Sequence, residues 1–376
     1  MSDLRLVFLS YRGGQVVEFS LRELGNRVTL LHIAPLDYWK QEFPRNTEGA
    51  VDWERATNHL IQASKAVGEY DHGRVRGKGC WRDDGGFVLH LGDRLLPPED
   101  TEFVPPLDYA AAHHRLYEVG LPLKGPNLKK ELSDAECREL AWLFQEFGWD
   151  DGISGYLLAG WTVLAPFCGV LDQRPHVWIT GPRNAAAFCY LVHPLIGDMG
   201  VMWCPDSDLG DVGSYHERKA LPFLLQLDHP RWRVRRKLRE VLALASSDRI
   251  HSMACLGTTH EPNLWDRDRD YVSVLSTREQ PTGRRYSRRY DQTLYPASKV
   301  EHLASRLMGR TFQWLRSGRL DESIEVCRRA VCETFHSAAA GDQYGILIAG
   351  AHVLASNEPP TIQGLRSWLQ RHHRAT

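Results

Sequence analysis

His176-Val-Trp-Ile-Thr-Gly-Pro-Arg-Asn184 is the stretch that decides the fold, and the apolar run 185–192 follows it directly. Its first five residues are typical of a short buried strand, and the run after Asn184 is compatible with a helix. A strand, a glycine loop and a helix in this order are the context of a phosphate-binding loop, because loop amides and the helix N-terminus point at the phosphates. The stretch therefore predicts an α/β core with a loop of this kind after one of its strands.

An intact phosphate-binding loop has the pattern G-x-x-x-x-G-K-[ST], and this chain departs from it at three positions. Counted from Gly181, the second glycine falls at Ala186, the lysine at Ala187 and the hydroxyl residue at Phe188. Ala187 removes the ammonium that neutralises the β- and γ-phosphates, and Phe188 removes the hydroxyl that holds Mg²⁺. Ala186 disfavours a backbone conformation that glycine adopts freely. We therefore predict a vestigial cofactor-binding loop made of Gly181, Pro182, Arg183, Asn184, Ala186, Ala187 and Phe188.

A second apolar strand, over residues 221–227, ends in an acid, the expected form of the strand that holds Mg²⁺ in a nucleotide fold. That acid is Asp228, and the next residue, where a catalytic glutamate would polarise the attacking water, is His229. A histidine beside a cation is a poor substitute for that base. We therefore expect no catalytic residue and treat Asp228 and His229 as vestigial. A further core strand is predicted over residues 271–277.

Composition shifts divide the chain into four parts. The boundaries follow a mixed strand and helix pattern, then a segment rich in proline and glycine, then alternating apolar helices and strands, then helical spacing alone. The fold class is α/β, with a P-loop NTPase-like (AAA+-like) core. The predicted parts are a small mixed α+β N-terminal module (1–100), a linker with a leading helix (101–150), the core (151–296) and a helical C-terminal region (297–376).

Local signals predict individual elements outside the core. Asp83-Asp-Gly-Gly86 between two apolar runs is a hairpin signal. Ser133-Asp-Ala-Glu136 is a capping box and predicts that a helix begins there. In the N-terminal module, strands are predicted over 4–9 and 28–33, and a helix over 52–67.

Composition bounds the class of protein. The 376 residues carry a net charge of −1 with a pI near 7.0, so the whole chain is not a basic nucleic-acid coat. Eight cysteines without a Cys-x-x-Cys pair predict reduced thiols rather than a disulfide framework. Cys189 and His193 supply two ligands, which do not make a metal site. The N-terminus has no secretory signal and no stretch is long enough to cross a membrane. We therefore expect a cytoplasmic protein without bound metal and without a membrane partner.

Two basic runs contain aromatic residues, a combination suited to phosphate neutralisation and base stacking. The alternative is a solvated helix face for the first run and a surface loop for the second. Arg288 and Arg289 could also derive from an arginine finger, which would act only on an intact partner subunit. The predicted nucleic-acid contacts are Arg231, Arg233, Arg235, Arg236, Lys237 and Arg239 in the first run, and Arg284, Arg285, Arg288 and Arg289 in the second.

The chain resembles the helicase-like ATPases encoded by phages, plasmids and integrated elements, relatives of the superfamily-3 helicases. The match rests on residues 34–39 with 52–53, 74–81 with 88–95, 160–182 and 342–351. The resemblance implies an AAA+-like core and ATP-driven DNA unwinding or translocation by a ring of subunits. This sequence departs from the family pattern at Ala186, Ala187, Phe188 and His229, the positions that would carry that activity.

These observations predict a catalytically degenerate helicase-like protein of a mobile element, which binds DNA or a protein partner, including a copy of itself, through the retained scaffold. No cofactor is expected. Three alternatives stay open. The loop after Thr180 could be an ordinary strand-to-helix turn. The chain could be an active ATPase that binds ATP and Mg²⁺, with Arg183 in place of the lysine and Asp228 for the metal. It could also be a protein-interaction subunit whose basic runs meet acidic partner surfaces.

Overall fold

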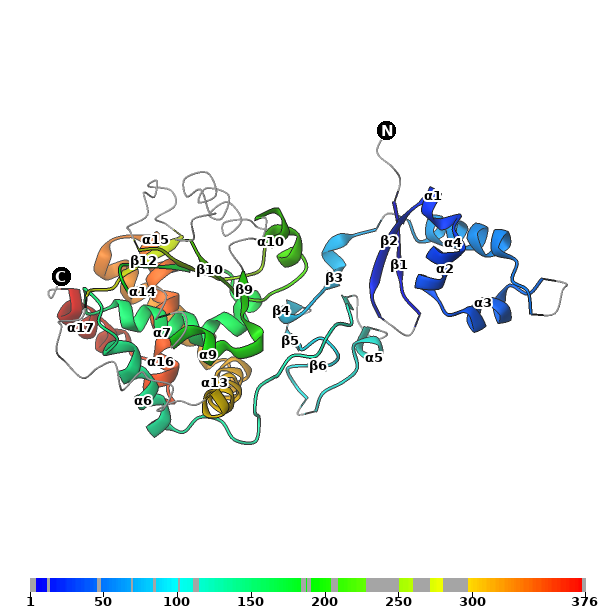
Figure 1. The fold of residues 1–376 in the computed structure, drawn as a ribbon. Coiled ribbons are helices and arrows are strands. Elements are labelled where there is room, and N and C mark those ends of the chain that lie inside the picture. Colours follow the sequence, from blue (N-terminus) through cyan, green and yellow to red (C-terminus); the bar gives the residue numbers. More distant parts are fainter. Residues whose placement is uncertain are drawn as a thin grey trace. The chain divides into compact units, whose positions relative to one another are not determined.

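The computed structural model describes residues 5–11, 14–45, 49–68, 70–83, 86–100, 102–110, 115–183, 187, 191–203, 209–227, 250–259, 271–279 and 297–373. The chain forms two compact units (Figure 1). The smaller unit contains residues 1–77, 92–95 and 103–122, and the larger contains 78–91, 96–102 and 123–376. These units cut the chain differently from the four predicted parts, because the hairpin region 78–91 belongs to the larger unit and much of the proline-rich segment to the smaller.

The smaller unit packs helices on an antiparallel hairpin of two strands, β1 (Arg5–Leu9) and β2 (Val16–Ser20). Its core contains Leu6, Leu24, Leu30, Trp39 and Ala56. A second, parallel pair joins β3 (Val75–Arg76) to β7 (Leu116–Tyr117). The helices are α1 (Leu21–Leu24), α2 (Arg27–Ile33), α3 (Leu36–Glu42), α4 (Trp53–Val67), the 3₁₀ turn η1 (His72–Arg74) and α5 (Pro106–Ala110).

The strand predicted over residues 28–33 is wrong, because this segment forms α2. The side chain of Asn26 caps the helix by accepting a hydrogen bond from the backbone N–H of Val28 at 2.9 Å. Leu30 and Ile33, three residues apart, share one buried face. A capping residue and helical spacing of the buried positions therefore outweigh the strand propensity of Val28 and Ile33.

The larger unit is built on a five-stranded sheet in which every neighbouring pair is parallel. Its spatial order is β12-β8-β11-β10-β9. This arrangement confirms a mixed α/β unit with a parallel sheet, and it contains the strands predicted over 176–180, 221–227 and 271–277. The strands are β8 (His176–Thr180), β9 (Val201–Trp203), β10 (Phe223–Gln226), β11 (Ala254–Gly257) and β12 (Val272–Ser276).

Both faces of this sheet are buried, which explains why its strands read as continuous apolar runs. Side chains alternate between faces along a strand. Two hydrophobic cores of different size lie on the two faces, and we call them the larger and the smaller core. On β8, Val177 and Ile179 belong to the larger core and Trp178 belongs to the smaller core. On β10, Leu224 faces the larger core and Phe223 faces the smaller one. The sheet is therefore a central layer that holds its strand ends in fixed positions.

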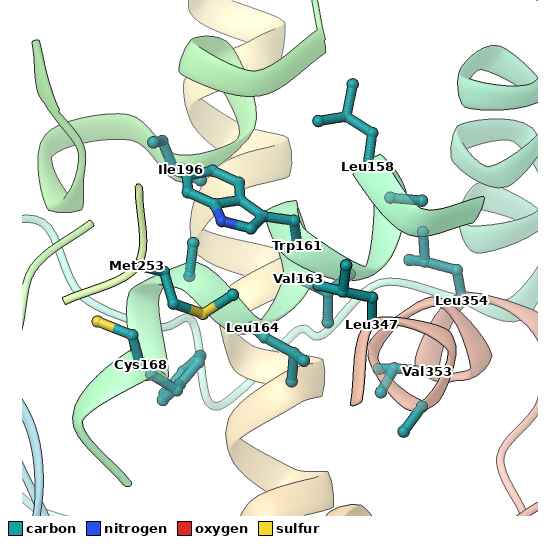
Figure 2. Close-up of a cluster of buried hydrophobic side chains, with 14 of the residues drawn as sticks. Leu158, Trp161, Val163, Leu164, Cys168, Ile196, Met253, Leu347, Val353 and Leu354 are labelled. Atoms are coloured by element: carbon teal, nitrogen blue, oxygen red, sulfur yellow. The ribbon is translucent and has the colours of Figure 1, made fainter. Parts of the chain in front are cut away.

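Helices cover the face of the sheet that carries the larger core. Figure 2 shows Leu158, Trp161 and Leu164 packed beside Leu347 and other side chains of this core. The helices, short turns and one π-helical segment of the larger unit are α6 (Asp134–Gln145), α7 (Ser154–Leu164), η2 (Ala165–Val170), α9 (His193–Ile196), η4 (Gly197–Met199), α10 (Leu209–His216), α13 (Ala297–Arg316), α14 (Arg319–Phe335), α15 (Ala338–Ala340), η6 (Gly341–Gly345), α16 (Ile346–Ala355) and α17 (Ile362–His373).

No helix among these described residues combines the length and apolar character needed to cross a lipid bilayer.

Two local predictions in this unit are confirmed. β4 (Gly79–Asp83) pairs antiparallel with β5 (Gly86–His90), which is the hairpin signalled by the turn between them, and β6 (Leu95–Leu96) follows. Helix α6 begins with the capping box, in which the Ser133 hydroxyl accepts from the backbone N–H of Glu136 and the Glu136 carboxylate accepts from that of Ser133.

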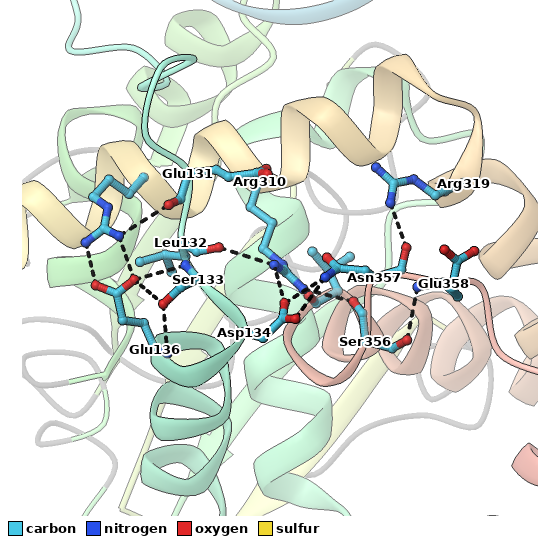
Figure 3. Close-up of polar contacts among 12 residues, drawn as sticks. Glu131, Leu132, Ser133, Asp134, Glu136, Arg310, Arg319, Ser356, Asn357 and Glu358 are labelled. Carbon is cyan, nitrogen blue, oxygen red and sulfur yellow. Dashed lines mark hydrogen bonds and ion pairs between the residues drawn. The ribbon is translucent and has the colours of Figure 1, made fainter.

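Two buried arginines of α13 hold the start of α6, and one of them, Arg310, also holds the end of α16 (Figure 3). Arg306 forms a two-pronged ion pair with Glu136, with both N···O distances 2.5 Å. Arg310, only 3% exposed, donates to the carboxylate of Asp134 at 3.0 Å. It also donates to the backbone carbonyls of Leu132, Val353 and Ser356. We call Arg306 and Arg310 the α13 clamp.

The carboxylate of Glu136 makes the clamp sensitive to acid. Hydrogen bonds from Arg306 and Ser133 lower the pKa of Glu136 from 4.5 to about 2, against the opposing effect of burial. A lowered folded-state pKa contributes stability above pH 4.5 that is lost as the pH falls toward 2. We therefore expect Glu136→Gln to remove part of the fall in unfolding free energy between pH 5 and pH 3, measured by urea denaturation.

The exposed carboxylate of Glu146, just beyond the same helix, provides the control for this prediction. Glu146→Gln should leave the pH dependence as it is in the unaltered protein. If the two variants have the same dependence on pH, the Arg306–Glu136 pair does not couple folding to acid.

Candidate nucleotide site at the carboxyl edge of the sheet

The predicted loop lies at the carboxyl ends of the parallel strands. Because β8, β11 and β12 are parallel and adjacent, Thr180, Thr258 and Ser276 end up at the same edge of the sheet. After β8 the chain forms β9, which is one outermost strand of the sheet. The last strand in the sequence, β12, is the outermost strand on the other side. Ligands of open α/β sheets bind outside the carboxyl ends of strands, where the order changes direction. The loop after β8 is therefore correctly placed for a ligand.

Gly181 is required by the close approach of a neighbouring segment. Its φ is +88°, in the region that favours glycine, and an added Cβ would lie 2.7 Å from Oγ1 of Thr277. The glycine at this position therefore has a structural reason that is independent of any nucleotide.

A hydroxyl network ties the loop to the end of β12. The Thr277 hydroxyl donates to the backbone carbonyl of Thr180 at 2.7 Å and accepts from the backbone N–H of Arg183 at 3.2 Å. The side chains of Thr180 and Ser276 lie 3.1 Å apart, within hydrogen-bond distance. All three hydroxyl groups thus make hydrogen bonds within the protein, and that of Thr277 holds the first turn of the loop against the end of β12.

The side chain of Arg183 contacts the segment that precedes α7. Its guanidinium lies over the ring of Phe147, 4.1 Å from the ring centroid, and donates to the backbone carbonyl of the same residue. Gly148, at φ +100°, leaves the space that the guanidinium occupies, because an added Cβ would lie 2.7 Å from Nη1 of Arg183. Arg183 was considered as a substitute for the missing lysine. Its guanidinium is therefore already bound to an aromatic ring and to a backbone carbonyl.

Ala187 is the residue that the sequence pattern aligns with the phosphate-binding lysine. It is fully buried and belongs to the larger hydrophobic core. Its backbone N–H donates to the carbonyl of Arg183 at 3.0 Å. The side chain at this position therefore faces the protein interior, an environment that disfavours an ammonium group.

Two contributors to this region were not identified from the sequence. Thr258, at the end of β11, accepts a hydrogen bond from the indole N–H of Trp178 at 2.9 Å. Phe147 receives Arg183, as described above. Thr258 lies beside the loop because β11 pairs with β8. This pairing depends on contacts between residues some 80 positions apart. The only sequence signal for Thr258 is a polar residue directly after an apolar strand.

The other predicted site residues lie outside the described residues. They are Asn184, Ala186 and Phe188 of the loop, the vestigial Asp228 and His229, and all ten basic residues predicted to contact nucleic acid. Within the described part of the chain, no group of three or more His, Cys, Asp or Glu side chains could hold a metal ion. His176, next to the loop strand, has a structural role, since its Nδ1 accepts from the backbone N–H of Ala254 at 2.9 Å.

Comparison with known proteins shows the fold. No protein-family model matches the chain, and no curated protein sequence is similar to it. A solved structure described as "SCCmec type IV Cch - active helicase" is similar in fold, with a TM-score of 0.54 at 9% sequence identity. The match covers 98% of this chain and 70% of that chain. This protein therefore has a helicase-like fold.

Proposed function

We propose that this protein is a catalytically degenerate helicase-like protein of a mobile genetic element, which binds DNA through its retained scaffold. The solved helicase with a similar fold is named for an SCCmec element, which supports the mobile-element context. One observation supports the proposal of degeneracy: Ala187, which the sequence pattern aligns with the phosphate-binding lysine, has its side chain in the hydrophobic core.

The contacts of Arg183 argue against an active ATPase with an atypical loop. A guanidinium that substitutes for the lysine has to reach the phosphates, but this one is placed on Phe147. Moving it to a nucleotide would break the cation–π contact and the hydrogen bond to the carbonyl of Phe147. Each of these is worth roughly 1 kcal/mol. The loop therefore favours the ligand-free arrangement.

The first test is nucleotide binding and turnover by the purified protein. We expect no saturable ATP binding, with or without Mg²⁺, and no release of phosphate above that of a buffer control. Calorimetric titration measures binding, and a coupled phosphate assay measures turnover. ATP turnover that Asp228→Asn abolishes would overturn the proposal and would make Arg183 the residue to examine.

The second test concerns DNA. Binding of single- and double-stranded oligonucleotides should weaken steeply with salt, since each neutralised phosphate releases counterions. Replacing Arg235 and Arg236 together by alanine should reduce the slope of log K against log[salt] by about 2. Replacing the exposed Arg138 and Arg329 in the same way provides a matched loss of charge that should leave the slope unchanged. Salt-independent or absent binding would point instead to a protein-interaction subunit.

A further inference from the structure

Helices α7 and α16 cross at very close range because each has a glycine at the crossing. A Cβ on Gly160 would overlap the carbonyl oxygen of Leu347, and one on Gly350 would lie 2.6 Å from the carbonyl oxygen of Gly160. Small side chains continue beside this crossing, with Ala159 on α7 and Ala351 on α16. Short side chains on two closely packed helices leave space next to their line of contact, since the backbones set the spacing.

That space is a cavity of about 440 Å³, which α6, α17 and the segment between α16 and α17 complete. The volume lies within the range of ordinary small-molecule sites. One wall is aromatic: the rings of Tyr156 and Trp368 meet edge to face, with centroids 4.8 Å apart. Pro359 and Pro360 also line the cavity. Most of the lining is therefore rigid and apolar.

Gln145 and Arg371 are two of the donors that line this cavity. The amide nitrogen of Gln145 is buried and has no hydrogen-bond partner among the described residues, a state that costs free energy until an acceptor arrives. Arg371, on α17, contributes a positive charge. Burial lowers the pKa of His352, and the carbonyl of Glu358, 2.8 Å from its Nε2, acts in the opposite direction. The polar groups of the cavity thus favour an oxygen acceptor and a negative charge.

We propose that this cavity binds a small, largely apolar carboxylate, with the apolar body between Tyr156, Trp368 and the alanines and the oxygen atoms toward Gln145 and Arg371. The guanidinium group recognises a carboxylate by charge-assisted hydrogen bonds. The cavity is formed by helices of the larger unit and involves none of the residues of the predicted nucleotide loop. The proposal is therefore independent of whether the protein hydrolyses ATP.

The test uses 1-naphthoate as an aromatic carboxylate and naphthalene as its neutral counterpart. Titration calorimetry on the full chain should show saturable binding of one naphthoate. Ala351→Phe fills the cavity and should weaken binding at least about tenfold, whereas Ala338→Phe, at an exposed position, should leave it unchanged. Arg371→Gln should weaken naphthoate about tenfold and leave the affinity for naphthalene as it was.

Folding of each variant is checked by thermal unfolding, and Ala141→Phe fills the cavity from α6 if Ala351→Phe does not fold. The absence of saturable naphthoate binding to the unaltered protein would overturn the proposal. A cavity that receives a side chain of a protein partner instead of a small carboxylate would give this result. Equal affinity in a folded cavity-filling variant and in the Ala338→Phe control would overturn it as well, because the naphthoate would then bind elsewhere.

Discussion

Replacing Arg310 by alanine is expected to lower the free energy of unfolding by about 2–4 kcal/mol, because a buried donor is lost from three backbone carbonyls and from the half-exposed carboxylate of Asp134. Arg310 is 3% exposed and donates to four oxygen atoms. The carbonyls of Val353 and Ser356 belong to the C-terminal end of α16, where no later turn of the helix can satisfy them. The cation also lies favourably at the negative end of that helix. Truncation leaves all of these acceptors without their donor.

Arg316 provides the control for this prediction, since it lies on the same helix but is exposed. Its one described side-chain hydrogen bond goes to the backbone carbonyl of Glu99 at 3.0 Å. Arg316→Ala should cost less than about 1 kcal/mol. Urea denaturation at neutral pH measures both changes. Equal losses for the two variants would mean that the α13 clamp does not hold α6 and α16 together.

The elements predicted correctly have local causes. Ser133 and Glu136 satisfy each other within one turn, so the capping box marks the start of α6 from four letters alone. β8 is an uninterrupted apolar run because both faces of its sheet are buried. The hairpin of β4 and β5 follows from a turn between two apolar runs. In each case the decisive contacts lie within a few residues or follow from burial, which hydrophobicity reports directly.

The contacts that could not be predicted join distant parts of the chain. Arg310 and Asp134 are 176 residues apart, and the sequence around either one carries no sign of the other. Arg183 and Phe147 are separated by 36 positions, so the sequence does not reveal that the guanidinium is already engaged. In the loop, the absence of the lysine could be read from the letters. The direction in which the replacement points could not, because it depends on how Ala187 packs against distant residues of the core.

Ala187→Lys, alone or together with Ala186→Gly, is expected to destabilise the protein rather than to restore nucleotide binding. Ala187 is fully buried in the larger core, so the substitution adds three carbon atoms and an ammonium group to a packed site. Overpacking and burial of the charge together should cost roughly 3–5 kcal/mol of unfolding free energy at neutral pH. Because burial lowers the pKa of a lysine, the loss should become smaller as the pH is raised.

Ala338→Lys, at an exposed position near the start of a helix in the same unit, is the matched control and should change stability by less than about 1 kcal/mol. Thermal and urea unfolding with and without ATP and Mg²⁺ measure both effects in one series, since a bound ligand would raise the stability of the variant. A stable Ala187→Lys variant that ATP stabilises further would show that this side chain can reach a nucleotide, and the loop would then be a phosphate site that lacks only its lysine. A destabilised variant on which ATP has no effect would show that the side chain at this position packs in the core and does not reach a nucleotide. A single substitution would then not restore the lost lysine.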